Sequence, residues 1–253
     1  MLLRLCSLLV NLITTIIAHL THICRELLHS RPPQASDIYT LYTLSCVGSK
    51  YDFQYLLDYA YKKLVLLFPT DDASTWRPCK GIKQMELNLV VQMIRLWHPR
   101  AANLLPLVFY AYCQLPLLVI TTSDRAGLPP LAWTDTERCI LAIPQLLKHK
   151  LRTYDVFTIH RTNYPNWCGD IACSNRMMQL SHALMTREDT STLPNPLENL
   201  EKWCRQRRPW KELCSVCTRG IVAELDRRRL EAWNDLGKIF NVPEWRISDA
   251  PPV

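Results

Sequence analysis

Apolar residues recur at three- and four-residue steps along much of this chain, and this spacing predicts helices. The first clear stripe follows a linker-like segment at residues 30–37, SRPPQASD. We expect a helix that starts near Ser49, where Ser49 and Asp52 resemble a capping box, and ends at Pro69. Its apolar positions are Phe53, Leu56, Leu57, Ala60, Leu64 and Leu67.

Two further stripes predict helices that each end at a proline. The earlier one runs from Leu87 to Leu96 and stops at Pro99. The next covers Ala101–Gln114 and stops at Pro116. Proline lacks a backbone N–H and clashes with the preceding turn, so it is a sound helix terminator in both places.

The second half of the chain predicts helices separated by irregular segments. A capping box at Thr134 and Glu137 starts a helix that we expect Pro144 to break. Residues 151–210 read as mostly irregular, and a last long helix runs from near Trp210 to about Phe240. Because no useful strand-period alternation occurs, the predicted class is mostly α, a bundle of helices followed by a helical tail. Predicted boundaries give segments 1–36, 37–115 and 116–253.

The segment at residues 1–28 is strongly apolar and allows several interpretations. Its cleanest stretch, Leu5–Leu20, is shorter than the roughly 20 residues that span a bilayer, and Asn11 lies in its middle. A buried helix is the favoured interpretation. A membrane anchor, an uncleaved signal and a wrongly assigned gene start are the alternatives.

Composition narrows the classes of protein that remain. Six glycines against seventeen prolines suit short helices and disfavour phosphate-cradling loops. Eleven cysteines and no Asn-x-Ser/Thr site favour a reducing compartment and predict a cytoplasmic or nuclear protein. Membrane association through residues 1–28 is the alternative. The net charge of +7 permits contact with nucleic acid or membranes but requires neither.

Four cysteines have the spacing of a structural zinc site. Cys168 and Cys173 form one pair, and Cys214 and Cys217 form a second, forty residues later. Pairs two to four residues apart can hold one zinc ion from short turns. The competing interpretation, which is favoured, is a set of buried thiols, because free cysteine is often buried and Cys204 lies close by in the sequence. His160 and His182 are substitute ligands.

A basic cluster lies between residues 201 and 230, with nine Lys or Arg against four acidic residues. Trp203 and Trp210 are interleaved with it, so phosphate contact and base stacking are conceivable. A solvated helix face gives the same composition more often, and that interpretation is favoured.

Nothing in the sequence indicates an enzyme. It contains no Gly-rich phosphate loop, no HExxH and no GxSxG. The acidic pair Asp135 and Glu137 is explained by a helix N-terminus, where the macrodipole favours negative charge. We therefore predict no catalytic residues and no cofactor other than zinc.

Three groups of residues, in this order, carry a resemblance to a known family. They are Lys50, Tyr51 and Asp52 with Leu56, Ala60 and Leu64; Phe109, Tyr110, Cys113, Gln114, Leu115 and Pro116; and Trp233, Leu236, Phe240, Pro243 and Trp245. The chain thereby resembles fungal BTB/POZ domain-containing proteins over roughly residues 38–246. The resemblance is to the C-terminal helices of the BTB fold and the helical tail, since residues 1–36 carry no strand pattern that would supply its N-terminal half.

This resemblance implies protein–protein interaction, as a dimer or as an adaptor of a ubiquitin ligase. We therefore expect a non-enzymatic interaction module whose partners are other proteins and, in one version, a second copy of itself. Large apolar anchors dominate such surfaces, and Trp76, Trp133 and Trp203 are the candidates. The favoured interpretation of each is a residue that simply caps the core. The alternatives are a zinc-stabilised nucleic-acid-binding module at residues 160–230 and a protein anchored to membranes by residues 1–28.

Overall fold

The computed structural model describes residues 37–70, 73, 76, 84–97, 101–116, 131–158, 168–187 and 195–243. Every regular element within these ranges is helical, and none of them contains a strand. The predicted mostly-α class is therefore confirmed. The apolar segment at residues 1–28 lies outside the described residues, as does most of the predicted linker.

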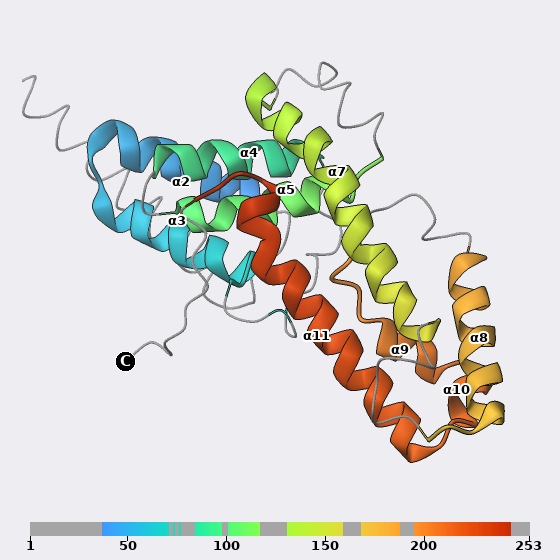
Figure 1. Cartoon of the computed structure of the whole chain (residues 1–253). Coiled ribbons are helices and arrows are strands. Elements are labelled where there is room, and N and C mark those ends of the chain that lie inside the picture. Colours follow the sequence, from blue (N-terminus) through green and yellow to red (C-terminus); the bar gives the residue numbers. More distant parts are fainter. Residues whose placement is uncertain are drawn as a thin grey trace, which may run out of the picture.

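The first half of the fold is a group of short helices (Figure 1). It comprises α2 (Ile38–Tyr51), α3 (Gln54–Leu67), α4 (Gln84–Leu96), the 3-10 turn η2 (Ala102–Leu104) and α5 (Leu105–Cys113). Helix α2 packs against both α3 and α4, and α4 packs against α5. The stripes expected at Leu87–Leu96 and Ala101–Gln114 are thus helical, as predicted.

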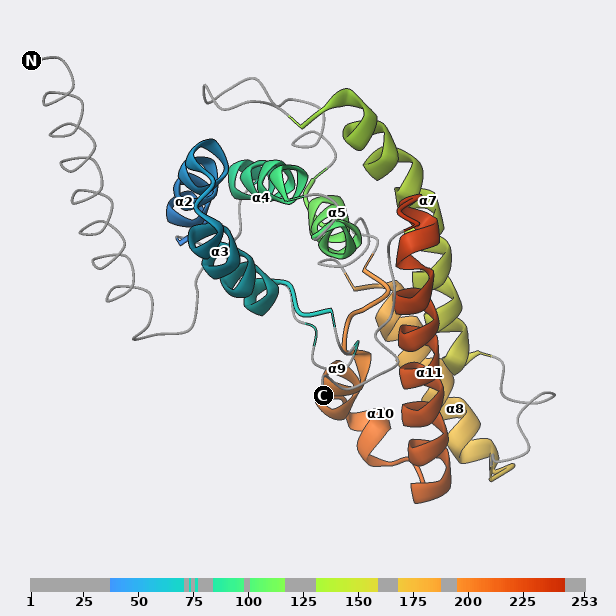
Figure 2. The same cartoon turned by 90° about the vertical axis from the view of Figure 1, so that its left-hand side faces the viewer.

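The second half is built on two long helices that lie side by side (Figure 2). They are α7 (Trp133–Tyr154) and α11 (Ser215–Ile239). The shorter elements η4 (Asp155–Phe157), α8 (Ile171–Met185), α9 (Leu200–Arg205) and α10 (Arg208–Lys211) gather around one end of this pair.

The chain turns from α2 into α3 at Asp52 and Phe53, which corrects the predicted helix start. Ser49 lies inside α2, and Asp52 takes a left-handed conformation with φ 56° as its C-cap. The backbone N–H of Phe53 donates to the carbonyl of Gly48 at 2.8 Å. A Cβ on Gly48 would lie 2.9 Å from a methyl carbon of Leu57, so glycine permits this close approach. The Ser49/Asp52 pair is therefore not a capping box.

Pro144 does not break α7, contrary to the prediction. The helix continues through it from Trp133 to Tyr154. Proline has no N–H, so the carbonyl of Ile140 loses its helical hydrogen bond. Because Pro144 is exposed, this bond is missing on the outer side of the helix. On the opposite side, Ala142 and Leu146 are fully buried. Packing against α5 and α11 outweighs the local cost of the proline.

Helices α8 and α9 occupy the segment that we expected to be irregular. Asp170 caps α8 by accepting a hydrogen bond from the N–H of Ala172 at 2.8 Å. The inner side of α8 then repeats buried residues at helical spacing: Cys173, Met177, Leu180 and Leu184. The expected last helix is also divided, because α10 ends at Lys211 and α11 begins at Ser215.

The larger of two hydrophobic cores joins the first half of the fold to the second. It contains most of the buried side chains of α2–α5, the middle of α7, and the C-terminal end of α11. Trp233 and Leu236 of α11 and its C-cap residue Phe240 are at most 1% exposed, and the Phe240 ring lies 5.8 Å from that of Phe109. This core therefore draws residues from both sides of the predicted boundary at 115/116, and the boundary stays a prediction.

The second core is smaller and lies at the other end of the long helices. We call the elements around it, η4, α8, α9, α10 and the N-terminal half of α11, the small lobe. Its buried side chains are Tyr154, Val156, Phe157, Met177, Leu180, Leu184, Leu200, Cys204, Trp210, Ile221 and Leu225. A core of this size gives a lobe little stability of its own, so additional cross-links matter here.

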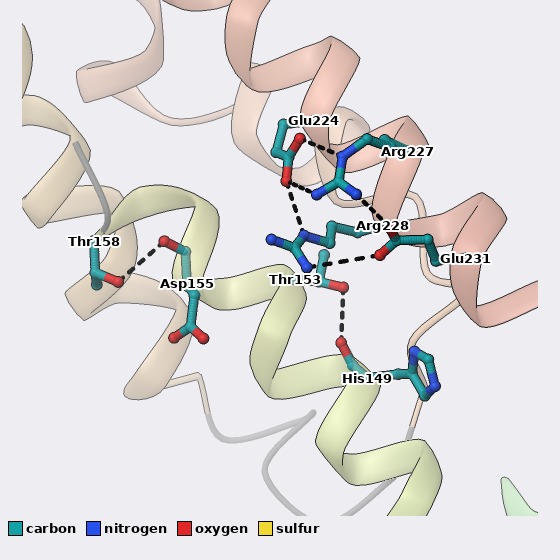
Figure 3. Close-up of polar contacts among 8 residues, drawn as sticks. All are labelled: His149, Thr153, Asp155, Thr158, Glu224, Arg227, Arg228 and Glu231. Carbon is teal, nitrogen blue, oxygen red and sulfur yellow. Dashed lines mark hydrogen bonds and ion pairs between the residues drawn. The ribbon is translucent and has the colours of Figure 1, made fainter. Parts of the chain in front are cut away.

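Between the two cores, ion pairs link residues within α11 (Figure 3), and a His149–Asp235 contact joins α11 to α7. Arg227 and Arg228 both donate to the buried carboxylate of Glu224, and both also pair with Glu231. From α7, His149 lies 3.3 Å from a carboxylate oxygen of Asp235. Burial is the main cause that holds the pKa of His149 below its usual value of 6.5.

The lowered pKa of His149 makes a pH prediction. Below pH 6.5 His149 takes up a proton more readily in the unfolded chain than in the folded one, so acidification favours unfolding. The stability that neutral, buried His149 contributes is therefore present above pH 6.5 and is lost as pH falls. We expect the free-energy advantage of the wild type over His149→Gln to shrink between about pH 7.5 and 5.5. Urea unfolding at each pH measures it. An advantage that grows on acidification would contradict the assignment.

Trp233 provides a test of the larger core. Replacing Trp233 by Ala removes a fully buried ring, and we expect a loss of about 3–5 kcal/mol in the free energy of unfolding. Leu230→Ala, on the same helix but half exposed, is the matched control and should cost less than about 1 kcal/mol. Urea unfolding followed by circular dichroism gives both values. Equal losses would contradict the packing described here.

Candidate metal centre

Four cysteines meet where α8 and α11 begin. Cys168 lies in the turn that precedes α8, and Cys173 lies in the first turn of that helix. Cys214 and Cys217 lie at the start of α11. The four sulfur atoms all lie within 4.8 Å of one another. The structure thus brings together the complete ligand set proposed from the sequence.

The turn before α8 presents the first pair. Gly169 has φ +71°, a left-handed conformation that other residues rarely adopt, and it separates Cys168 from the capping residue Asp170. Cys173 then follows in the first turn of α8. As a result Cys168 is exposed while Cys173 is only 2% exposed, so the pair approaches the site from the outer and inner sides.

The second pair is fixed by the cap of α11. Cys214 is the N-cap residue, and its sulfur accepts a hydrogen bond from the N–H of Cys217 at 3.4 Å. The hydroxyl of Thr218 donates to the Cys214 carbonyl at 3.0 Å and holds the same turn. Cys217 is 1% exposed and therefore lies on the buried side of the site. The Cys-x-x-Cys spacing therefore coincides with one helical turn.

The sulfur separations fit a tetrahedral zinc ion. With Zn–S bonds of about 2.3 Å, ligand sulfurs in a regular tetrahedron lie about 3.8 Å apart. The sulfurs of Cys217 and Cys168 lie 3.3 Å apart, and no pair exceeds 4.8 Å. Small side-chain rotations are enough to bring these distances to the ideal value.

The electrostatics favour negative charge at the site but oppose it on the buried thiols. The hydrogen bond from Cys217 N–H lowers the pKa of Cys214 to about 7. Burial, in contrast, raises the pKa of Cys173 and Cys217 above the usual value for a thiol. Both helix N-termini carry partial positive charge. A divalent cation would supply the remaining charge needed to keep all four sulfurs as thiolates.

Ion pairs next to the cysteines join the same two segments. Arg176, three residues after Cys173, donates to Glu212, two residues before Cys214, at 3.2 Å. Arg208 reaches the same carboxylate at 2.8 Å. Together the two arginines lower the pKa of Glu212. These contacts are exposed and stabilise little by themselves, but they hold α8 beside α10.

Other cysteines behave as buried thiols, the alternative considered from the sequence. Cys204 lies inside the small lobe's core, and burial raises its pKa to about 12. Cys113 is also buried, and its thiol donates to the carbonyl of Cys139 at 3.4 Å. Of the proposed substitute ligands, His182 is exposed on α8 and does not belong to the cluster, and His160 lies outside the described residues.

Part of the positive charge of the basic cluster is paired within the cluster itself. All four of its acidic residues pair with its arginines, through Glu201–Arg205, Glu212–Arg208, Glu224–Arg227 and Asp226–Arg229. Trp210 is buried, and the guanidinium groups of Arg207 and Arg187 lie 4.6 and 5.6 Å from the ring centre of Trp203. Both indole rings of this segment therefore have partners within the fold.

The three proposed tryptophan anchors have different environments. Trp76 is buried and meets Tyr110 edge to face, with ring centres 4.9 Å apart, so it is a core residue. Trp203 is partly buried beneath its two arginines. Trp133 is 74% exposed at the start of α7 and alone has the accessibility of a binding anchor.

A cavity of about 220 Å³ lies between α3 and α4. Its lining is mainly apolar: Gln54, Leu57, Tyr61, Leu96 and Trp97. None of its described lining residues supplies a carboxylate, an imidazole or a thiol.

No family model matches this chain, and neither a curated protein nor a solved structure is significantly similar to it. The resemblance to BTB/POZ proteins therefore stays a prediction. Among the described helices, none combines the length and apolar character needed to cross a bilayer.

The metal centre makes a direct prediction. Cys214→Ala/Cys217→Ala removes two of four ligands, so the purified double variant should contain almost no zinc while the wild type contains one ion per chain. Cys204→Ala is the matched control, because it removes a neighbouring buried thiol outside the cluster and should keep the zinc. Mass spectrometry of the metal content measures all three. Equal zinc in both variants would place the ion elsewhere.

Proposed function

We propose that this protein is a non-enzymatic helical interaction protein whose small lobe is held in shape by a structural zinc ion. The observation that carries the zinc part is the meeting of four cysteine sulfurs within 4.8 Å at the starts of two helices. Such an arrangement rarely arises by chance, because each helix must begin at a fixed position for all four cysteine side chains to converge.

The ligand set favours a structural role over a catalytic one. Catalytic zinc keeps an open position for water or substrate, usually with three protein ligands. Here four thiolates would close the coordination sphere. Two of the four ligands, Cys173 and Cys217, are also nearly inaccessible to solvent, which leaves little room for a substrate.

The position of the site explains what the ion would stabilise. It connects α8 to α11 across the intervening α9 and α10, which are only six and four residues long. Helices this short are marginal without tertiary support. Since a metal bound only by the folded state adds its binding free energy to folding, zinc would compensate for the lobe's limited core.

The interaction part of the proposal is supported by the exposed apolar side chains of α7 and α8. Trp133 and Leu141 on α7, and Ile171 and Met178 on α8, are each more than half exposed. Large exposed apolar groups on helix faces are typical of helix-based recognition. The resemblance to BTB/POZ tails supports the same class of function, with scaffolding or ubiquitin-ligase adaptation as the specific role.

Removing zinc should loosen the small lobe while the rest of the fold persists. We expect a chelator to accelerate amide hydrogen exchange in α8, α9, α10 and the first turns of α11, because their cross-link is lost. Amides of α2–α5 should change little, since their core lies at the other end of the molecule.

Hydrogen exchange read by mass spectrometry measures this pattern. The Cys214→Ala/Cys217→Ala variant is the control, and its exchange should not respond to the chelator. Unchanged protection of α8 after complete zinc removal would contradict the structural role.

A further inference from the structure

Helix α7 carries an apolar stripe on the side opposite its buried residues. Trp133, Leu141, Leu147 and Leu151 are 74%, 63%, 38% and 47% exposed, and Pro144 between them is exposed as well. Their spacing places all five on one side of the helix. The other side, with Ala142 and Leu146, packs on the main core. We call these five residues the α7 stripe.

The α7 stripe is large enough to form the centre of a specific interface. Its ends are eighteen residues apart, which corresponds to about 27 Å of helix. A tryptophan offers roughly 200 Å² and a leucine somewhat less, so the exposed portions amount to about 400 Å² of apolar surface. A standard interface buries about 800 Å² per partner, of which roughly 60% is apolar. The stripe supplies most of that share.

Two charges within the stripe make it complementary to itself. Glu137 lies towards one end and Lys148 towards the other, both exposed, and neither forms an ion pair with another described residue. They are eleven residues apart, about 16 Å, so they do not meet within one chain. The midpoint of Glu137 and Lys148 coincides with that of Leu141 and Pro144. At 3.6 residues per turn the two charges point in nearly the same direction, on the side of the stripe where Leu141 lies.

These features match an antiparallel pair of α7 helices related by a two-fold axis at that midpoint. The axis keeps each edge of the stripe on its own side, so Glu137 would face Lys148 of the partner subunit twice. Leu141 would meet Pro144 of the partner subunit at the centre, and Trp133 would cover Leu151 of the partner subunit at each end. The opposed helix macrodipoles of an antiparallel pair add to the attraction.

We propose that the α7 stripe binds a second copy of this chain, so that the protein is a two-fold symmetric dimer through α7. This names a partner for the interaction function proposed above and does not depend on the zinc site, which lies in the small lobe.

The mass of the full-length zinc-loaded protein in solution tests the dimer. Sedimentation equilibrium at micromolar concentrations should give twice the chain mass of 29.5 kDa. Leu141→Glu places two charges at the centre of the interface and should give the mass of a single chain. Leu66→Glu, at an equally exposed leucine on α3, is the control and should leave the dimer intact.

A charge exchange tests the register. Glu137→Lys or Lys148→Glu alone sets like charges opposite each other twice and should weaken the dimer at least about tenfold. The double variant Glu137→Lys/Lys148→Glu restores both pairs and should recover most of the wild-type affinity. Such recovery cannot arise within one chain, where the two side chains are about 16 Å apart.

Two results would overturn the proposal. One is a wild-type protein that stays a monomer, which would mean that something other than a second copy covers the stripe. The other is a dimer that survives Leu141→Glu or that the double exchange fails to restore. Zinc content is measured on the same samples, so failure of the dimer and failure of the metal centre are separate outcomes.

Discussion

The packing of α7 along α11 is the contact on which the rest of the fold depends. The two helices run in opposite directions, and their pairing spans both hydrophobic cores (Figure 2). The C-terminal end of α11 contributes Trp233 and Leu236 to the main core, while its N-terminal half contributes Ile221 and Leu225 to the small lobe. Between the cores, His149 and Asp235 join the pair. The candidate metal centre thus lies at the small-lobe end of this pair of helices.

The metal centre itself follows from how two helices start. A cysteine at an N-cap and another in the first turn occupy neighbouring positions, and α11 uses both in this way. Helix α8 reaches the same result with Asp170 as its cap and Gly169 turning Cys168 back towards Cys173. Burial makes two of the thiols resist ionisation, so the site is stable as a thiolate cluster only with a cation present. The arrangement of the sulfur atoms and the charge of the thiolates therefore both support the zinc ion proposed above.

Sequence patterns predicted the helical class, the α4 and α5 segments and the four cysteines, because each depends on local spacing. The patterns failed where tertiary packing determines whether a segment is helical. The break expected at Pro144 did not occur because the proline lies on the exposed side of a helix held by packing. Helix α8 was missed because the Asp170 cap and the Cys173–Leu184 spacing lie among polar residues and sulfur-bearing side chains that weaken the apolar signal. No spacing rule could have shown that α8 and α11 begin side by side.

The coordination of zinc in the purified protein tests the central claim most directly. Zinc K-edge X-ray absorption reports the number, type and distance of the ligands around the ion. The account predicts four sulfur ligands at about 2.3 Å and no oxygen or nitrogen neighbours. A spectrum that requires nitrogen or oxygen ligands, or a protein purified and reconstituted under reducing conditions that binds no zinc, would contradict it.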